Sequence, residues 1–291
     1  MQHSGSIRIN GADLFYSMAG EQNESVMVVL HGGRGFGTHA GVFATYRPLG
    51  HGLRLIGFDM RGHGRSSLTP PYTFDQLVED LEQIRQTLGG GRRLILLGGS
   101  FGGMIALSYA MKYGHNLSHL ILRGTAPSWH HELQAREVFT RRAAHTAPMA
   151  SRRMLEKLFS PDIVDNTEFR LIMYALAPLY ADEDRPIDYD ALLETARAGV
   201  YNAQVHNDLF ADKAYDVTAR LHEIAVPTLI LCGQDDWICP AAQSRLMAKR
   251  IPLSRLVVVP GENHGINPAI TLNEVKRFLL DMVISHKRGN F

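Results

Sequence analysis

The stretch LILLGGSFGGMIALSYA, residues 94–110, decides the fold class of this chain. It begins with an apolar run typical of a buried strand, and it ends with small side chains that let a helix pack closely. Between these parts, residues 98–102 match G-x-S-x-G, the pattern of a serine on a sharp turn from a strand into a helix. The flanking glycines allow close approach of backbone segments, and the helix N-terminus favours a developing negative charge. We therefore predict that Ser100 is a nucleophile, whereas Ser66 and Ser67 lack such a turn.

Short apolar runs alternate with helical patterns on both sides of this stretch. The runs are continuous rather than alternating in polarity, as expected for strands that are covered on both faces. Residues 7–16 add a hairpin, because Asn10-Gly11 supplies the positive φ angles of a tight turn. These patterns predict an α/β fold with a mostly parallel sheet, helices on both faces and an antiparallel hairpin at one edge. The further runs are VMVVL (26–30), LRLIGF (53–58), HLILRG (119–124), PTLILC (227–232) and RLVVV (255–259).

The alternation stops between about residue 126 and residue 220. This stretch is rich in helix formers and has no strong strand, and prolines such as Pro148 and Pro178 divide it into short pieces. We predict a helical cap over residues 126–220, inserted into a core domain made of residues 1–125 and 221–291. Because the insertion follows a strand, it is expected above the carboxyl ends of the strands, where ligands bind in such sheets.

Composition excludes several functional classes. The chain has 30 Lys and Arg against 29 Asp and Glu, a net charge of +1, so no strong field directs it to nucleic acid or anionic lipid. No apolar run approaches the roughly 18 residues of a membrane span. The first residues also lack the apolar core of a secretory signal, and we therefore expect a cytoplasmic protein. Cys232 and Cys239 cannot form a disulfide scaffold and are expected as free thiols. No motif such as H-E-x-x-H occurs, so neither a metal nor a cofactor is expected. The oligomeric state is left open.

A serine nucleophile needs a general base and a group that orients it. His264 lies in PGENHG, directly after the last predicted strand, and it follows Ser100 in the chain as the order serine, acid, histidine requires. His31 and His63 also follow strands, but they precede the nucleophile. The acid is expected in the loop after PTLILC, where Asp235 and Asp236 are adjacent.

A glycine-rich turn, LHGGRGFG at residues 30–37, is expected to supply an oxyanion hole. One N–H donor would come from Gly33 in this loop and the other from Phe101, the residue after the nucleophile. The alternative is a phosphate-binding loop, but the chain lacks a Walker Lys-Ser/Thr pair and a dinucleotide fingerprint. A second glycine-rich turn, residues 58–67, contains Asp59 and Arg61, for which we predict a structural salt bridge.

With these motifs in order, the chain resembles the α/β-hydrolase superfamily over nearly its whole length. Within it, the chain is similar to the proline iminopeptidase and tricorn-interacting aminopeptidase group, on HGG (31–33), GGSFGG (98–103) and residues 215–240. Two positions differ from that group. Arg34 stands where the group usually has Pro in HGGPG, and Phe101 stands where it usually has Trp or Tyr.

The resemblance implies further residue roles. It favours Asp236 over Asp235 as the acid, because similar hydrolases have G-x-x-D with a Pro four residues later. It also implies that peptidases of the group hold the free amino group of the substrate with acidic cap residues. The candidates in this chain are Glu168, Asp184, Glu194 and Asp208.

The leading hypothesis is a cofactor-independent serine hydrolase that forms an acyl-enzyme with a small-molecule or short-peptide substrate. Ser100 attacks, His264 moves the proton and Asp236 orients His264. The favoured activity is that of a proline iminopeptidase-like aminopeptidase, and the alternative is a carboxylesterase or lactonase with an apolar pocket. A carbon–carbon hydrolase is disfavoured by Gly99 in place of the Asn in GNSFGG, and a non-catalytic receptor by the complete triad. The pocket candidates are Leu171, Met173, Tyr174, Leu176, Leu179 and Tyr180.

Overall fold

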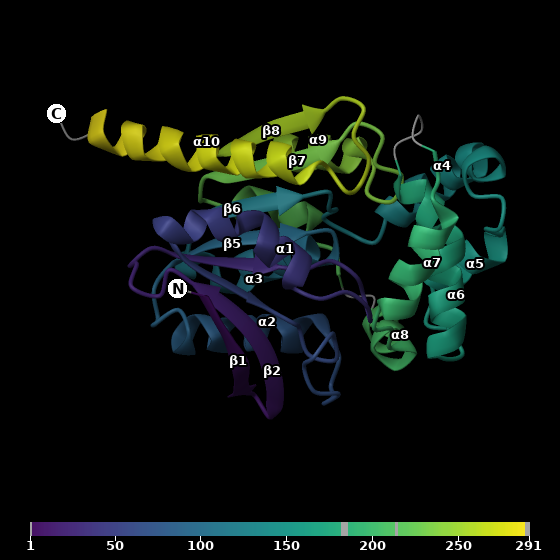
Figure 1. Cartoon of the computed structure of the whole chain (residues 1–291). Helices are drawn as coiled ribbons and strands as arrows, with labels where there is room; N and C mark the ends of the chain where they lie inside the picture. Colours follow the sequence, from purple (N-terminus) through teal and green to yellow (C-terminus); the bar gives the residue numbers. More distant parts are fainter. Residues whose placement is uncertain (1, 182–185, 213–214, 289–291) are drawn as a thin grey trace.

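A single eight-stranded sheet organises the chain in the computed structural model, which describes residues 2–181, 186–212 and 215–288 (Figure 1). The strand order is β1-β2-β4-β3-β5-β6-β7-β8. The pairs β1–β2 and β2–β4 are antiparallel and all other pairs are parallel, which confirms the predicted α/β fold class. The strands are β1 (Gln2–Ile9), β2 (Ala12–Ala19), β3 (Val26–Leu30), β4 (Arg54–Phe58), β5 (Leu94–Gly99), β6 (Leu117–Arg123), β7 (Thr228–Gly233) and β8 (Ser254–Val259).

The N-terminal hairpin forms at the predicted turn. Asn10 and Gly11 have φ angles of 44° and 81°, and Ile9 pairs with Ala12 across the turn. These left-handed angles suit Gly and are tolerated by Asn, so the local sequence fixes the register of β1 against β2.

Alternate side chains of the central strand β3 enter two different cores. Val26, Val28 and Leu30 pack on the face covered by α2, α3 and α9. Met27 and Val29 pack on the face covered by α1 and α10. This burial on both faces explains the continuous apolar run in the sequence. The helices of the two layers are α1 (Ala40–Tyr46), α2 (Phe74–Thr87), α3 (Phe101–Tyr113), α9 (Ala241–Arg250) and α10 (Pro268–Arg288), with 3-10 turns η1 (Arg47–His51), η2 (Gly114–Asn116) and η4 (Thr218–Glu223).

The cap helices lie together beyond the carboxyl ends of the parallel strands (Figure 1). Several begin at a residue whose side chain accepts a hydrogen bond from the first turn, such as Ser151, Asp165 and Asn202. The predicted boundaries at residues 126 and 220 stay a prediction. The elements are α4 (His131–Thr146), α5 (Arg152–Leu158), α6 (Asn166–Leu176), η3 (Ala177–Tyr180), α7 (Tyr189–Ala198) and α8 (Ala203–Ala211).

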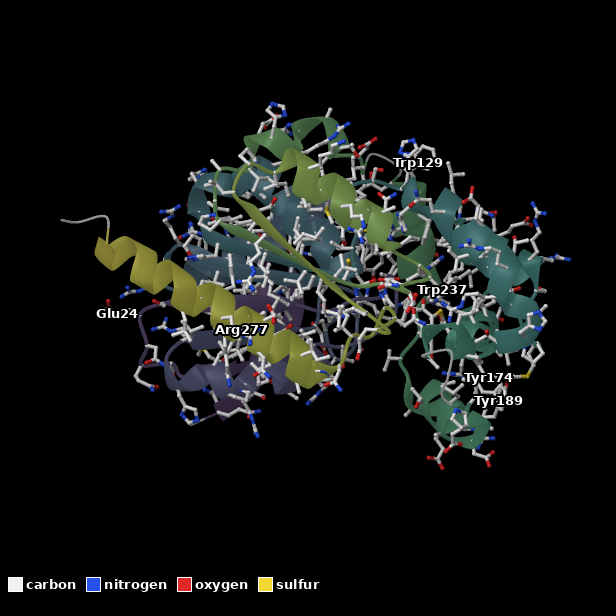
Figure 2. All side chains as sticks on the ribbon, turned by 90° about the horizontal axis from the view of Figure 1, so that it is seen from above. Glu24, Trp129, Tyr174, Tyr189, Trp237 and Arg277 are labelled. Carbon is white, nitrogen blue, oxygen red and sulfur yellow. The ribbon has the colours of Figure 1, made fainter. Side chains whose placement is uncertain are left out.

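Trp237 connects the core to the cap. It follows β7 in the chain, is fully buried and belongs to the apolar cluster of the cap, with its ring centroid 5.1 Å from that of Tyr180. Figure 2 shows Trp237 where the core meets the cap helices. In the described residues, both cysteines are free and buried, and no helix is long and apolar enough to cross a membrane.

The predicted salt bridge between Asp59 and Arg61 is wrong. Asp59 binds the ring and the N–H of His39, each at 2.7 Å, and Arg61 binds both oxygens of Asp80 at 2.8 Å. Asp80 belongs to α2, and His39 directly precedes α1. Arg61 therefore attaches the glycine-rich turn to the helices on one face of the sheet, and Asp59 attaches it to the helices on the other face.

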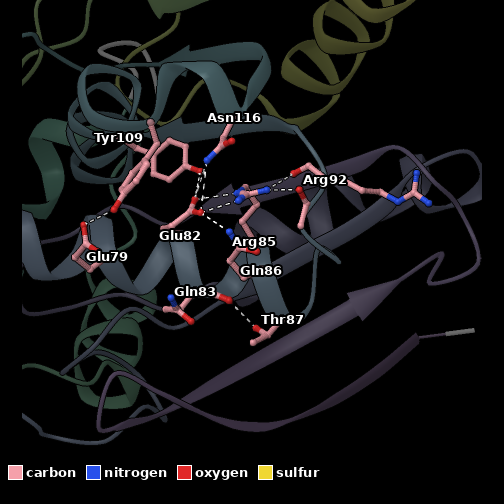
Figure 3. A network of polar contacts seen from close by, with 11 residues as sticks. Glu79, Glu82, Gln83, Arg85, Gln86, Thr87, Arg92, Tyr109 and Asn116 are labelled. Carbon is pink, nitrogen blue, oxygen red and sulfur yellow. Dashed lines mark hydrogen bonds and ion pairs between the residues drawn. The ribbon is translucent and has the colours of Figure 1, made fainter.

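A buried polar network joins α2 to α3 (Figure 3). Glu82 accepts hydrogen bonds from Arg85, from the hydroxyl of Tyr109 at 2.7 Å and from Gln86 at 2.8 Å. Burial alone would raise the pKa of Glu82, but these donors outweigh it and lower the pKa from 4.5 to about 2. Because the folded-state pKa lies below the unfolded one, this stabilisation is complete above about pH 4.5 and is lost as the pH falls toward 2.

We predict that Glu82→Gln lowers the free energy of unfolding by about 2–3 kcal/mol at pH 7, because charged hydrogen bonds in a buried site become neutral ones. The difference from the unmutated protein should shrink as the pH falls below 4.5, where Glu82 begins to take up a proton on unfolding. Urea unfolding across this range measures both effects. Glu79→Gln, a half-buried position on the same helix, is the control, and an equal loss in both variants would contradict the prediction.

Candidate active site

Ser100 occupies the sharp turn between β5 and α3 with φ 53° and ψ −124°. Side chains rarely adopt this left-handed backbone, and holding one there costs on the order of 1–3 kcal/mol. The neighbouring glycines make the turn possible. A Cβ at Gly98 would collide with the backbone of Gly102, and a Cβ at Gly102 would collide with the carbonyl oxygen of His31.

The end of β6 holds the turn in place. The N–H of Ser100 donates to the carbonyl oxygen of Arg123 at 2.9 Å, and the hydroxyl of Thr125 donates to the carbonyl oxygen of Ser100 at 2.7 Å. Arg123 also donates from its guanidinium to the carbonyl oxygen of His264 at 2.9 Å. The strand that supports the serine is therefore tied directly to the loop of the predicted base.

His264 and Asp236 form a hydrogen-bonded pair. His264 Nδ1 lies 2.8 Å from Asp236 Oδ2, and since a carboxylate only accepts, Nδ1 donates and Nε2 remains available for a proton. The other oxygen of Asp236 accepts from the N–H groups of Ile238 and Cys239 at 3.0 and 2.8 Å. Asp235 is exposed, whereas Asp236 is 3% exposed and contacts the histidine.

Asn263 is a functional candidate that sequence reasoning missed. It is buried, its side-chain oxygen accepts from the N–H of His264 at 2.8 Å, and its amide donates to the carbonyl oxygens of Leu179 and Ala181 at 2.7 and 2.8 Å. It thus fastens the histidine loop to the cap. The sequence feature that could have pointed to Asn263 is its position directly before His264.

Two neutral histidines shape the glycine-rich loop after β3. His31 Nδ1 donates to the carbonyl oxygen of Gly32 at 2.8 Å, and its Nε2 accepts from the N–H of Met60 at 3.0 Å. His63 Nδ1 donates to the carbonyl oxygen of Arg61 at 2.9 Å, and its Nε2 accepts from the N–H of Gly35 at 2.9 Å. Burial lowers the pKa of His31 to about 3 and also lowers that of His63, so both rings are neutral near pH 7.

The two predicted oxyanion donors face the same cavity as the serine. Gly33 has a φ of 90°, and the described residues place no hydrogen-bond acceptor on its N–H. Phe101 is the first residue of α3, so its N–H has no acceptor within the helix. Ser100, His264, Gly33 and Phe101 thus all line the same cavity, and His264 is hydrogen-bonded to Asp236.

The cavity between core and cap has a volume of about 810 Å³ and a largely apolar lining. Of the six predicted pocket residues, Met173, Tyr174 and Tyr180 line it. Leu171 is 57% exposed, so its predicted place in the pocket is wrong. Leu176 and Leu179 are buried in the apolar cluster of the cap instead.

The predicted acidic cap residues do not face the cavity where they are described. Glu168 binds Lys157 and the N–H of Val164, Glu194 is exposed, and Asp208 accepts from Gln204. Asp184 lies outside the described residues. In the described part of the chain, the cavity lining holds no carboxylate, and no cluster of His, Cys, Asp and Glu is suited to a metal ion.

Comparison with known proteins agrees with this geometry. The family model for the alpha/beta hydrolase fold matches residues 25–268. This chain belongs to the α/β hydrolase family. It is therefore a hydrolase, and its relatives place it in the proline iminopeptidase-like group.

Two relatives illustrate that group. The proline iminopeptidase PfmaB of Pestalotiopsis fici is 41% identical over 264 residues, which cover 90% of this α/β hydrolase and 92% of the relative. The proline iminopeptidase of Saccharolobus solfataricus is 27% identical, with 89% and 86% covered.

Solved structures show the same fold. A hydrolase from Pseudomonas aeruginosa has a TM-score of 0.72 and 24% identity, with 95% of this chain and 98% of that chain covered. A meta-cleavage product hydrolase from Pseudomonas fluorescens also has a TM-score of 0.72, at 17% identity, with 96% and 98% covered. At these identities the likeness concerns the fold alone.

Because the strain resides at the Cβ-bearing residue of the turn, we predict that Ser100→Gly is more stable than Ser100→Ala by about 1 kcal/mol. At an ordinary position the order is reversed, since Gly gives the unfolded chain more freedom. Urea unfolding of the two variants measures the difference. Equal stability, or a more stable Ala variant, would show that the turn stores no strain.

Proposed function

We propose that this α/β hydrolase is a serine hydrolase that works through Ser100, His264 and Asp236. One observation carries the proposal. The strained Ser100 shares a cavity with His264, and the far side of the His264 ring is hydrogen-bonded to the buried Asp236. A serine nucleophile needs a base beside it and an acid that orients that base, and these observations support that assignment.

The proposed reaction has two halves. Ser100 Oγ attacks the substrate carbonyl while His264 Nε2 takes the hydroxyl proton, and the N–H groups of Gly33 and Phe101 stabilise the oxyanion. The intermediate then expels the leaving group, which receives the proton from His264, and an acyl-enzyme remains. Water next attacks the acyl-enzyme, giving its proton to His264, and the collapse of the second intermediate returns that proton to Ser100 as the acid leaves.

Asp236 acts through the histidine. Its hydrogen bond to Nδ1 fixes the tautomer that leaves Nε2 free to accept a proton, and its charge stabilises the imidazolium that forms. The N–H groups of Ile238 and Cys239 orient the carboxylate for this task. Asp236 itself stays unprotonated throughout the cycle.

The first candidate substrate is a short peptide with an N-terminal proline or another small residue. The names of the relatives support it, since proline iminopeptidases share up to 41% identity with this chain in the comparisons above. Such a substrate carries an ammonium group, which calls for a carboxylate in the cavity. The described cavity lining supplies none.

The second candidate is a carboxylic ester or lactone, and the cavity lining favours it. Phe159, Met173 and Tyr201 from the cap, together with Phe101 and Ile238 from the core, offer apolar contacts to a neutral acyl group. An ester also has a better leaving group than an amide, so it needs less help from the protein to react.

We predict that Ser100→Ala lowers kcat by roughly 10³-fold or more, and that Asp236→Asn lowers it by about 10³- to 10⁴-fold through the wrong histidine tautomer. Steady-state turnover and labelling with a fluorophosphonate probe measure these effects. Asp235→Asn, the exposed neighbour, is the matched control and should stay within about threefold of the unmutated enzyme. Full turnover in Ser100→Ala, or equal losses in both Asn variants, would refute the triad.

The substrate class is tested by comparing proline 4-nitroanilide with 4-nitrophenyl butyrate. Because the described cavity lining is largely apolar, we expect the enzyme to prefer the ester. The ratio of kcat/KM for the ester to that for the anilide should exceed the ratio of their intrinsic reactivities. Alkaline hydrolysis of the two compounds supplies that reference ratio. A higher kcat/KM for the anilide than for the ester would instead establish the aminopeptidase.

A further inference from the structure

Arg34 places a guanidinium on the wall of the catalytic cavity. It directly follows Gly33 in the oxyanion loop, at the position where the resembled peptidases have proline. Its guanidinium carbon lies 4.1 Å from the ring centre of Phe210 and 5.7 Å from that of Phe101. These rings hold the guanidinium beside the nucleophile turn through cation–π contacts.

Among the described residues, no carboxylate counter-ion is in contact with Arg34. Its guanidinium donates a hydrogen bond to the thioether sulfur of Met104 at 3.2 Å, and sulfur is a weak acceptor. In the described ranges of the chain, no carboxylate oxygen lies within 4.0 Å of an Arg34 nitrogen. A guanidinium carries five N–H donors, so most of its donor capacity remains for a molecule in the cavity.

Acidic residues near Arg34 line a small cavity next to the catalytic one, and they include Glu132 and Asp212. Arg34 also lines this small cavity, whose volume is about 20 Å³. Burial lowers the pKa of Arg34, and the weaker effect of Glu132 raises it. The guanidinium stays charged, because arginine does not lose its proton in proteins. Glu132 therefore offsets part of the cost of burying this charge, and it is absent from the lining of the catalytic cavity.

Two nearby histidines of the wall are neutral. Burial, with the charge of Arg34 as the next largest influence, lowers the pKa of His131 to about 4 and that of His206 to about 3. His131 Nδ1 donates to the carbonyl oxygen of Ser128, and His206 Nδ1 lies 3.3 Å from the carbonyl oxygen of Arg34. On this part of the wall, the positive charge thus belongs to Arg34 rather than to the imidazoles.

We propose that Arg34 is an anion-binding residue of the cavity and that the substrate is an ester carrying a carboxylate a few bonds from the scissile carbonyl. This inference rests on the proposed serine hydrolase function. A carboxylate matches the planar fork of donors that arginine presents, and a cavity screened from water strengthens the pairing. The Arg34 guanidinium carbon lies 5.7 Å from the ring centre of Phe101, the residue after Ser100, so a bound carboxylate is expected close to the reacting carbonyl.

Two pairs of esters test the proposal and locate the carboxylate. In the first pair, 4-nitrophenyl hydrogen glutarate is compared with its methyl ester, so that only the charge on the acyl part changes. In the second, the butyryl ester of 4-hydroxybenzoate is compared with that of methyl 4-hydroxybenzoate, which changes the charge on the leaving group. The measured quantity is the ratio of kcat/KM for the anionic ester to that for the neutral one, after subtraction of the uncatalysed rate.

We expect a ratio at least tenfold in favour of the anion for one pair, and a fall of tenfold or more in that ratio in Arg34→Met and Arg34→Gln. Arg34→Lys should keep part of the preference, because it retains the charge without the planar fork. Arg65→Met is the matched control, since Arg65 is an exposed arginine stacked on Phe15 at 3.7 Å outside the cavity. In Arg65→Met, the ratio of kcat/KM for the anionic ester to that for the neutral ester should equal the ratio for the unmutated enzyme.

Binding to Ser100→Ala supplies a readout that does not need turnover. We expect glutarate monomethyl ester, measured by calorimetry, to bind Ser100→Ala at least tenfold more tightly than Ser100→Ala/Arg34→Met. The absence of an anionic preference, or equal losses for both members of each pair in the Arg34 variants, overturns the role of Arg34. If the unmutated enzyme neither turns over an ester nor reacts with a fluorophosphonate, the serine hydrolase proposal fails, and the calorimetry alone decides whether Arg34 binds carboxylates.

Discussion

The close approach of three backbone segments at the nucleophile turn constrains the rest of the molecule. β5 can pass into α3 over a single residue with φ 53° only because Gly98 and Gly102 present no Cβ to each other or to the backbone of His31. The loop after β3 must therefore lie directly against the start of α3. This contact places both Gly33 and Phe101 in the lining of the cavity.

That contact requires the loop after β3 to keep its shape. His31 and His63 provide this support from within, each as a neutral ring that donates at one nitrogen and accepts at the other. A protonated ring would have two donors and would lose the bond to the N–H of Met60 or of Gly35. The burial that lowers the pKa of both histidines thus preserves the donor and acceptor pattern that the loop needs.

Local patterns predicted the hairpin at Asn10-Gly11, the strands and the turn at Ser100, because steric limits on a few adjacent residues determine each of them. Features that depend on distant partners were not predictable in the same way. Arg61 pairs with Asp80 rather than with Asp59, and the helical period of α6 shows an apolar face without showing whether it meets the cavity, the cap core or solvent. The pattern therefore could not show that Leu171 is exposed while Met173, two residues later, lines the cavity. Asn263 was missed because its role depends on carbonyl oxygens more than 80 residues away.

The two halves of the His264–Asp236 pair are both anchored in the cap. Trp237, the neighbour of Asp236, is embedded in the cap cluster, and Asn263, the neighbour of His264, binds the backbone at Leu179 and Ala181. In the proposed mechanism, cap contacts therefore help to hold both the acid and the base, whereas Ser100 is held by the backbone at the end of β6. The alignment of the proposed acid and base thus depends on the contacts that Trp237 and Asn263 make with the cap as well as on the sheet.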